Sequence, residues 1–186
     1  VSNADQIQID ASAARTLSSA DAVTITSNVD GIVLDGGSNT VTISSAADQD
    51  IAIAGVTDDG AGGTAASLTL SSEGNVTTAS IDLDDTIDGA LSITVDSDNN
   101  DAESETLAIS GGISNVASIA LSGGFTADSD DIIDINSDLS TTSGAITVSN
   151  ADQVQIDASA ARNLSSAGAV TMTGNVDGIL LDGGSN

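Results

Sequence analysis

The acidic loops are the part of this 186-residue chain whose residue types could do chemistry. Asp96, Asp98 and Asn100 stand at alternate positions in the segment DSDNND, as ligands do at the start of a calcium-binding loop. The pattern then departs from that loop, because Asp101 replaces the sharp-turn glycine and Leu107 replaces the bidentate glutamate. A solvated acidic loop without a bound ion is the alternative interpretation. Together with the segment DSDD, these loops supply the candidate Ca²⁺ ligands, which are Asp96, Asp98, Asn100, Asp101, Asp128, Asp130 and Asp131.

Enzymatic chemistry is not expected from this composition. The chain has no His, Cys, Lys or Tyr, so the usual general bases and activated nucleophiles are missing. Glycosidases use pairs of carboxylates, and Asp84 and Asp85 form such a pair in sequence. Adjacent residues point in different directions, however, and aspartate is a turn former in its own right. The composition therefore predicts that the chain is not an enzyme.

The charge of the chain limits its partners. It carries 28 acidic and 2 basic residues, a formal net charge of −26. Nucleic-acid binding needs a basic surface, which this sequence lacks. The longest apolar run, near residues 51–56, is far too short to span a bilayer. We therefore predict neither nucleic-acid binding nor membrane insertion, and we expect such a charged molecule to depend on cations, Ca²⁺ above all.

The elements that must position these loops are short β-strands. Segments such as AVTIT, TVTIS and SLTLS alternate apolar and polar residues, which is the period of a half-buried strand. Turn signals of Asp and Gly separate them. One helical turn is expected in DASAAR, residues 10–15. Val33 breaks the alternation, so we expect it to face a second apolar surface such as a fibre contact, with Thr24 and Thr42 pointing outward. The residues expected to be buried are Val23, Ile25, Ile32, Leu34, Val41 and Ile43.

Two all-β architectures fit this pattern. Sandwich domains usually centre on a large aromatic residue, whereas this chain has 1% aromatic residues and no Pro. A β-solenoid suits the small Val, Ile, Leu and Ala side chains, because each coil needs only its neighbours. We therefore predict a β-solenoid, with a string of β-sandwich domains as the alternative. Two strands per coil would give coils of ~18–20 residues, ~7–8 coils per repeat unit and a rise of ~34–38 Å. Coils with three faces would give fewer turns and a shorter rise.

The sequence repeats itself at a distance of 147 residues. Residues 1–39 align without a gap with residues 148–186, and 33 of these 39 positions are identical. We interpret residues 1–147 as one complete unit and residues 148–186 as the start of the next, within a longer tandem array. The two copies are expected to adopt the same backbone, related by a screw along one axis.

Segments such as NVDGIVLDGGSNTVTI, in tandem copies without Cys or Lys, resemble the bacterial secreted β-strand-repeat surface proteins. These are the filamentous-haemagglutinin-like and giant-adhesin group. The resemblance covers the whole chain in style and rests on no diagnostic motif. It implies an extracellular or cell-surface location and a fibrous stalk or matrix role.

The function expected from these features is a structural segment of an extracellular fibre. It would form a stalk or self-assemble, in a biofilm matrix or in cell-surface adhesion, and its partners would be copies of itself along or across the fibre. One alternative is an adhesin stalk or binding module whose tip lies elsewhere. Another is an ice-binding solenoid, since outward threonines would form rows, with Thr24, Thr26, Thr42, Ser44, Thr171 and Thr173 as their members.

Overall fold

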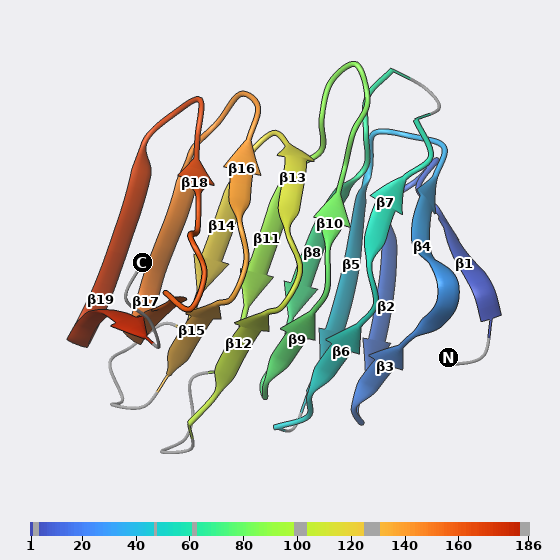
Figure 1. Ribbon diagram of the computed structural model, residues 1–186. Helices are drawn as coiled ribbons and strands as arrows, with labels where there is room; N and C mark the ends of the chain where they lie inside the picture. The colour runs from blue at the N-terminus through green and yellow to red at the C-terminus, as the bar shows by residue number, and fades with distance from the viewer. Residues whose placement is uncertain (2–3, 47, 61–62, 99–103, 125–130, 183–186) are drawn as a thin grey trace.

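The chain folds as a β-solenoid, in which parallel strands of successive coils stack side by side along one axis (Figure 1). The computed structural model describes residues 1, 4–46, 48–60, 63–98, 104–124 and 131–182. These residues form 19 strands joined by turns and bends, with no helix among them. Sandwich domains are built from antiparallel sheets. The parallel stacking therefore confirms the predicted solenoid and not the alternative.

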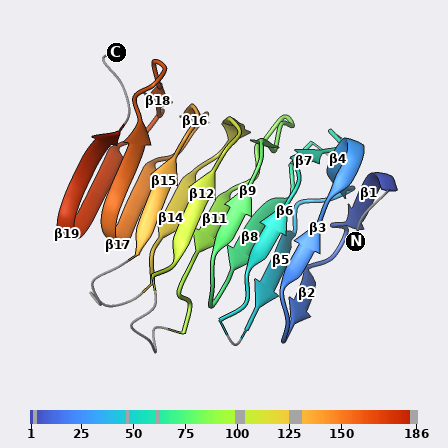
Figure 2. The ribbon, with the colours of Figure 1, turned by 60° about the horizontal axis from the view of Figure 1, so that its bottom comes forward.

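Each coil contributes one strand to each of three faces. Face 1 is the seven-stranded sheet, formed by β1 (Ala4–Asp10), β4 (Ser27–Asp35), β7 (Val56–Asp58), β10 (Ile81–Asp82), β13 (Ile113–Val116), β16 (Leu139–Thr141) and β18 (Leu164–Ser165). Face 2 holds β2 (Arg15–Ser19), β5 (Thr40–Ser45), β8 (Ser67–Ser71), β11 (Leu91–Thr94) and β14 (Ile119–Ser122). Face 3 holds β3 (Val23–Ile25), β6 (Ile51–Ile53), β9 (Val76–Thr78), β12 (Thr106–Ile109) and β15 (Ile132–Ile135), which lie side by side in Figure 2.

Two long strands join faces 2 and 3 into one twelve-stranded sheet. β17 (Ile146–Asp157) pairs with β14 through its first residues and with β15 through its last ones, so it bends around the corner between these faces. β19 (Val170–Asp182) follows β17 along both parts. Within each of these strands, the first part therefore belongs to face 2 and the second part to face 3.

The coils are longer than two strands per coil would make them. Paired residues on neighbouring coils lie 25 positions apart between Ile7 and Ile32, and from 21 (Ile135 and Ile156) to 32 (Ile81 and Ile113) elsewhere. The estimate of ~18–20 residues for a coil of two strands was wrong, because three segments close one coil, which is the alternative with fewer turns. The seven strands of face 1 are separated by six full turns of the chain.

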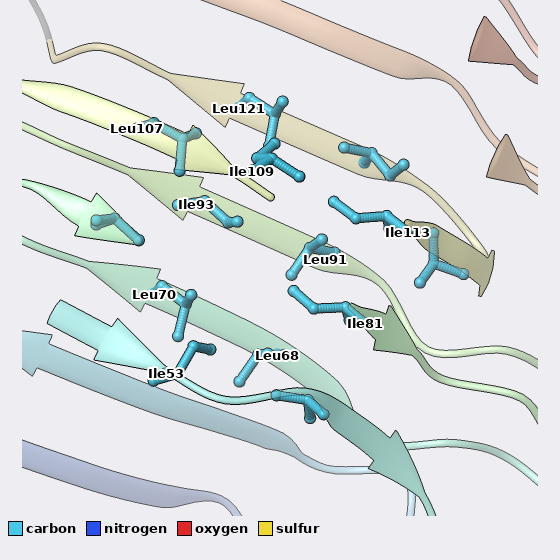
Figure 3. Packing of buried hydrophobic residues seen from close by; sticks show 14 of the residues in the cluster. Ile53, Leu68, Leu70, Ile81, Leu91, Ile93, Leu107, Ile109, Ile113 and Leu121 are labelled. Atoms are coloured by element: carbon cyan, nitrogen blue, oxygen red, sulfur yellow. The ribbon is translucent and has the colours of Figure 1, made fainter. Parts of the chain in front are cut away.

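The core is a set of apolar ladders inside the coils. On face 2, Leu68 pairs in register with Leu91, and Leu70 pairs with Ile93, which pairs in turn with Leu121 (Figure 3). All five side chains are at most 1% exposed. Because period two sends alternate residues inward, every coil adds one layer to each ladder. Burial was predicted correctly for five of the six residues, namely Ile25, Ile32, Leu34, Val41 and Ile43.

Three local expectations differ from the structure. Val23 is only half-buried and Thr42 is half-buried, whereas Thr24 is exposed as predicted. Val33 is 8% exposed, so it is already covered within the chain and does not offer the expected apolar surface to a fibre neighbour. The segment 10–15 contains no helical turn: the Ser12 amide donates to Asp10 Oδ1 at 2.8 Å, and Arg15 begins β2.

The two copies of the repeat make the same local pairings. Ile7 pairs with Ile32 in the first copy, and Val154 pairs with Ile179, at the corresponding positions, in the second. The amide of Ala11 donates to the Asp35 carbonyl at 2.7 Å, and Ala158 repeats that bond to Asp182 at 2.5 Å. Near-identical sequence thus gives the same coil-on-coil register at both ends of the stack.

Candidate cation-binding site

Carboxylates gather along one edge of the solenoid, where face 2 turns into face 3. Five successive coils contribute to this edge through the connections β5–β6, β8–β9, β11–β12 and β14–β15 and through the bend of β17. Parallel coils place corresponding corners above one another, about 4.8 Å apart. We call this edge the acidic corner, and its described acidic residues are Asp48, Asp50, Glu73, Asp96, Asp98, Glu105, Asp131 and Asp152.

Three of these side chains converge closely enough to hold one metal ion. Asp48, Glu73 and Asp98 each offer a carboxylate oxygen, and the three oxygen atoms lie within 4.8 Å of one another. Each residue comes from a different coil, and Asp48 adopts a left-handed φ of 56° at its turn. Carboxylate oxygens from several coils are the hard ligands that Ca²⁺ prefers.

Four further carboxylates of the acidic corner are buried. Asp96 is 0% exposed, Asp131 and Asp152 are 2% exposed, and Glu105 is 4% exposed. The Glu105 amide lies 3.4 Å from Asp131 Oδ1 and donates to it, and the Asp152 amide donates to the Asp131 carbonyl at 3.0 Å. A buried carboxylate is costly in its charged form unless hydrogen bonds and a counter-charge offset the lost hydration.

The cationic side chains of the chain are placed elsewhere. Arg15 binds the Asp10 carboxylate and Arg162 binds the Asp157 carboxylate, at corresponding positions of the two copies. The sequence holds no Lys or His. The negative charge at the acidic corner must therefore be balanced by cations from outside the chain or removed by protonation.

The structure brings together part of the predicted site. Asp96 and Asp98 lie directly after β11, and Asp131 lies directly before β15, all on the acidic corner. Asn100, Asp101, Asp128 and Asp130 lie outside the described residues. We predicted ligands from adjacent positions in one loop, whereas the converging set comes from separate coils.

Sequence reasoning missed the members of the acidic corner that stand alone in sequence. Asp48 and Glu73 are separated by 25 residues, and so are Glu73 and Asp98. This interval equals the common coil length, so an acidic residue recurring at the coil period was the available signal. It could be used only once the coil was known to contain three strands.

Other aspartates satisfy backbone groups at the turns. Oδ1 of Asp58 accepts the amide of Gly60 at 3.0 Å, within its own turn. Oδ1 of Asp50 accepts both the amide and the Nδ2 of Asn75 on the next coil, at 3.0 and 2.9 Å. A short side chain is needed to reach these groups, which explains why aspartate predominates over glutamate.

The second aspartate of each copy has a strongly lowered pKa. Hydrogen bonds from Ser12, and then from Arg15, lower the pKa of Asp10 from 3.8 to about 2, and Ser159 and Arg162 do the same for Asp157. Because the folded-state pKa is depressed, the stabilisation is present above pH 3.8 and is lost as the pH falls through about 2.

We predict that NMR titration of Asp10 has its midpoint near 2 and that Ser12→Ala raises it, since the Ser12 hydroxyl bond is the largest cause of the shift. Asp157 in the same variant is the internal control and should keep its midpoint near 2. A midpoint near 3.8 for Asp10 in the unaltered chain would contradict this assignment.

A second group of acids, between faces 1 and 2, behaves in the opposite way. A hydrogen bond from Asp59, burial and the charge of Asp59 raise the pKa of Asp35. Burial is the main cause that raises the pKa of Asp58. Protonation of these groups is favoured by folding, so their ionisation opposes stability as the pH rises.

Face 2 differs from the other faces because its strands carry no acidic residue. Its only charged residue is Arg15, at the start of β2. The outward positions form two in-register rows of mostly hydroxyl side chains. The first row is Thr16, Thr42, Thr69, Ser92, Ala120, Thr147 and Thr171; the second is Ser18, Ser44, Ser71, Thr94, Ser122 and Ser149.

These rows correct the expected arrangement of outward threonines. Thr24 lies on face 3, so it does not share a row with Thr42 and Thr171 on face 2. Asp96 belongs to neither row, because it is buried at the acidic corner beyond Thr94.

No family model, curated protein or solved structure matches this chain. Within the described part of the chain, no helix is long and apolar enough to cross a membrane.

Proposed function

We propose that this chain is a structural segment of an extracellular fibre, built by stacking coils of tandem 147-residue units. One observation carries the proposal: the same 39-residue segment occurs at both ends of one stack, with the same pairing register. A stacking pattern that recurs in this way can be repeated along one axis, as in other solenoids. The absence of His, Cys, Lys and Tyr from the sequence also favours a structural role over catalysis.

The resemblance to secreted β-strand-repeat surface proteins supports a place at the cell surface or in a biofilm matrix. A stalk that carries an adhesive tip elsewhere is the alternative form of this role. The two forms differ in a simple test: a fibre former assembles by itself, whereas a stalk stays monomeric until its tip binds.

Cations, Ca²⁺ in particular, are proposed to stabilise the rod at the acidic corner. The first 147 residues hold 24 of the 28 acids and one Arg, a net charge of −23. The unit contains close to 5.7 coils, so it rises ~27 Å and carries about 0.9 charge per Å. Duplex DNA carries one charge per ~1.7 Å and still condenses counterions. Asp48, Glu73 and Asp98 offer such an ion oxygen atoms from three coils, so binding would tie those coils together.

Calcium should raise the melting temperature by about 5–10 °C at a concentration 100 times its dissociation constant. Asp48→Asn removes one proposed ligand and tolerates the left-handed turn, so it should lose at least half of that rise. The matched control is Asp21→Asn, which removes the same charge from an exposed position between β2 and β3, outside the acidic corner, where the second copy has Gly168.

The measurement is circular dichroism during heating, with Ca²⁺, with Na⁺ at matched ionic strength, and with chelator. If Na⁺ raised the melting temperature as much as Ca²⁺, or if the two variants lost the same part of that rise, the cations would act only as a diffuse ionic atmosphere. Either result would contradict a site at Asp48.

Lateral contact between copies of the chain is proposed to use face 2. Two rods of this charge repel each other wherever acids face acids, and face 2 is the face whose strands carry none. Face-to-face packing of two antiparallel rods would also bring two acidic corners together, where divalent cations could bridge them.

Thr69→Asp, in the middle of face 2, should therefore reduce light scattering in Ca²⁺ several-fold. Thr77→Asp places the same charge on face 3 of the same coil, at an exposed position, and should leave scattering near that of the unaltered chain. Equal scattering from the two variants, both folded by circular dichroism, would exclude face 2 as the contact.

The two hydroxyl rows of face 2 also favour a second candidate function, ice binding. Apart from Arg15, this face is uncharged, and its rows are regularly spaced because they follow the coil stacking. Thermal hysteresis of the purified chain, abolished by Thr69→Asp and kept in Thr77→Asp, would establish this function in place of lateral contact.

A further inference from the structure

We infer that successive 147-residue units are turned by one face, a third of the circumference, so that the acid-free face winds around the fibre from unit to unit. The inference deepens the proposed function. Its extension to a long array rests on that function, whereas the rotation between units can be observed between the two copies in this chain. The rotation follows from the face on which each segment lies in the two copies.

The same segment lies on different faces in the two copies. Residues 4–10 form β1 on face 1, whereas their counterparts, residues 151–157, form the second part of β17 on face 3. The next segment moves in the same sense: Leu17 in β2 lies on face 2, and its counterpart Leu164 in β18 lies on face 1. The third segment shows the same shift by one face, because Val23 is on face 3 and its counterpart Val170 is on face 2.

The cause is the number of strand segments in one unit. Six coils of three segments make 18 segments, and the second copy of β1 is the eighteenth, so one unit contains 17. Seventeen is not a multiple of three, and each unit therefore completes five and two-thirds coils. Three units, or 441 residues, return to the starting face after 17 whole coils.

This geometry changes what a fibre can contact. With 18 segments per unit, the acid-free face would run straight along one side, and rods could associate only in pairs or flat layers. With 17 segments, face 2 carries the acid-free surface in one unit and face 1 carries it in the next. A rod of three units therefore offers the surface to copies of itself in three directions, and the acidic corner turns with it.

Cysteine cross-linking tests the rotation between the two copies in this chain, which has no native cysteine. Neighbouring parallel strands lie about 4.8 Å apart, within the Cα separation that a disulfide spans. Thr147→Cys with Thr171→Cys should form a disulfide on oxidation, because these residues are in register on face 2. Thr42→Cys with Thr69→Cys, also in register on face 2, is the positive control.

The competing pair is Thr147→Cys with Asn163→Cys. Asn163 is the counterpart of Thr16, so if the units were in phase it would lie on face 2, in the row of Thr16 and above Thr147, and this pair would cross-link instead. Formation of that disulfide, or failure of the Thr147–Thr171 pair while the control forms, would contradict the rotation between units.

A protein of three units extends the test to the array. A single cysteine at the position of Thr69 in the first two units is labelled with biotin and streptavidin and viewed by electron microscopy. The two labels should leave the rod a third of a turn apart, about 27 Å along the axis. Labels on the same side would overturn the inference. Neither result depends on lateral contact, which the scattering of Thr69→Asp tests separately.

Discussion

Leu34→Ala should lower the free energy of unfolding by about 2–5 kcal/mol, the usual cost of deleting a fully buried leucine side chain. Leu34 is 0% exposed and lies between β1 and β7, in register with Ile9 and Asp58. The ladder cannot close over the missing atoms, because the strand spacing is held by the backbone hydrogen bonds of three coils. The loss should appear as a lower urea midpoint by circular dichroism.

The repeat supplies a matched control for this variant. Leu181 is the counterpart of Leu34 in the second copy, followed by the same residue, Asp182 for Asp35, and preceded by Leu180 in place of Val33. It pairs with Ile156 on one side only and is 69% exposed. Leu181→Ala should therefore cost less than about 1 kcal/mol. Similar losses in the two variants would mean that stacking of coils is not what buries Leu34.

Gly31→Ala is the second variant with a large expected effect. Gly31 has φ +76°, and a Cβ atom there would lie 2.5 Å from the carbonyl oxygen of Gly55 on the next coil. The left-handed conformation alone costs alanine about 1–2 kcal/mol. Pushing two coils apart should add about 1–3 kcal/mol, as overpacking does elsewhere.

Gly178 separates these two contributions. It is the counterpart of Gly31, with φ +73°, and a Cβ atom there would meet nothing within 4 Å. Gly178→Ala should therefore show the conformational cost without the clash. Urea unfolding of both variants gives the difference directly, and equal losses would show that the approach of Gly31 to Gly55 does not limit the stacking.

The fold class could be predicted from the sequence because the alternation is a local property. Val41 and Ile43 are buried and Thr42 lies between them on the other side, as period two requires. The number of strands per coil could not be predicted in the same way. Coil closure depends on which turns bend the chain inward, and Asp and Gly occur at turns of every kind. The burial of Val33 was missed for a related reason, since it depends on the neighbouring coils.

The candidate site was harder to predict than the fold. Alternate acids in DSDNND suggested a loop that binds calcium by itself, whereas Asp48, Glu73 and Asp98 converge only because three coils stack. Residues 25 positions apart become neighbours through the coil length, which is a property of the whole stack. The rotation between units could not be predicted for the same reason, because its prediction requires the number of segments per unit and the number of faces per coil.

Small-angle X-ray scattering of proteins with one, two and three units tests the central claim that the chain grows as a rod. Each added unit should lengthen the particle by about 27 Å, with the radius of gyration of its cross-section unchanged. A separately folded compact domain of 147 residues would add a bead roughly 38 Å across. Increments near that larger value, or a cross-section that changes with the number of units, would contradict the account.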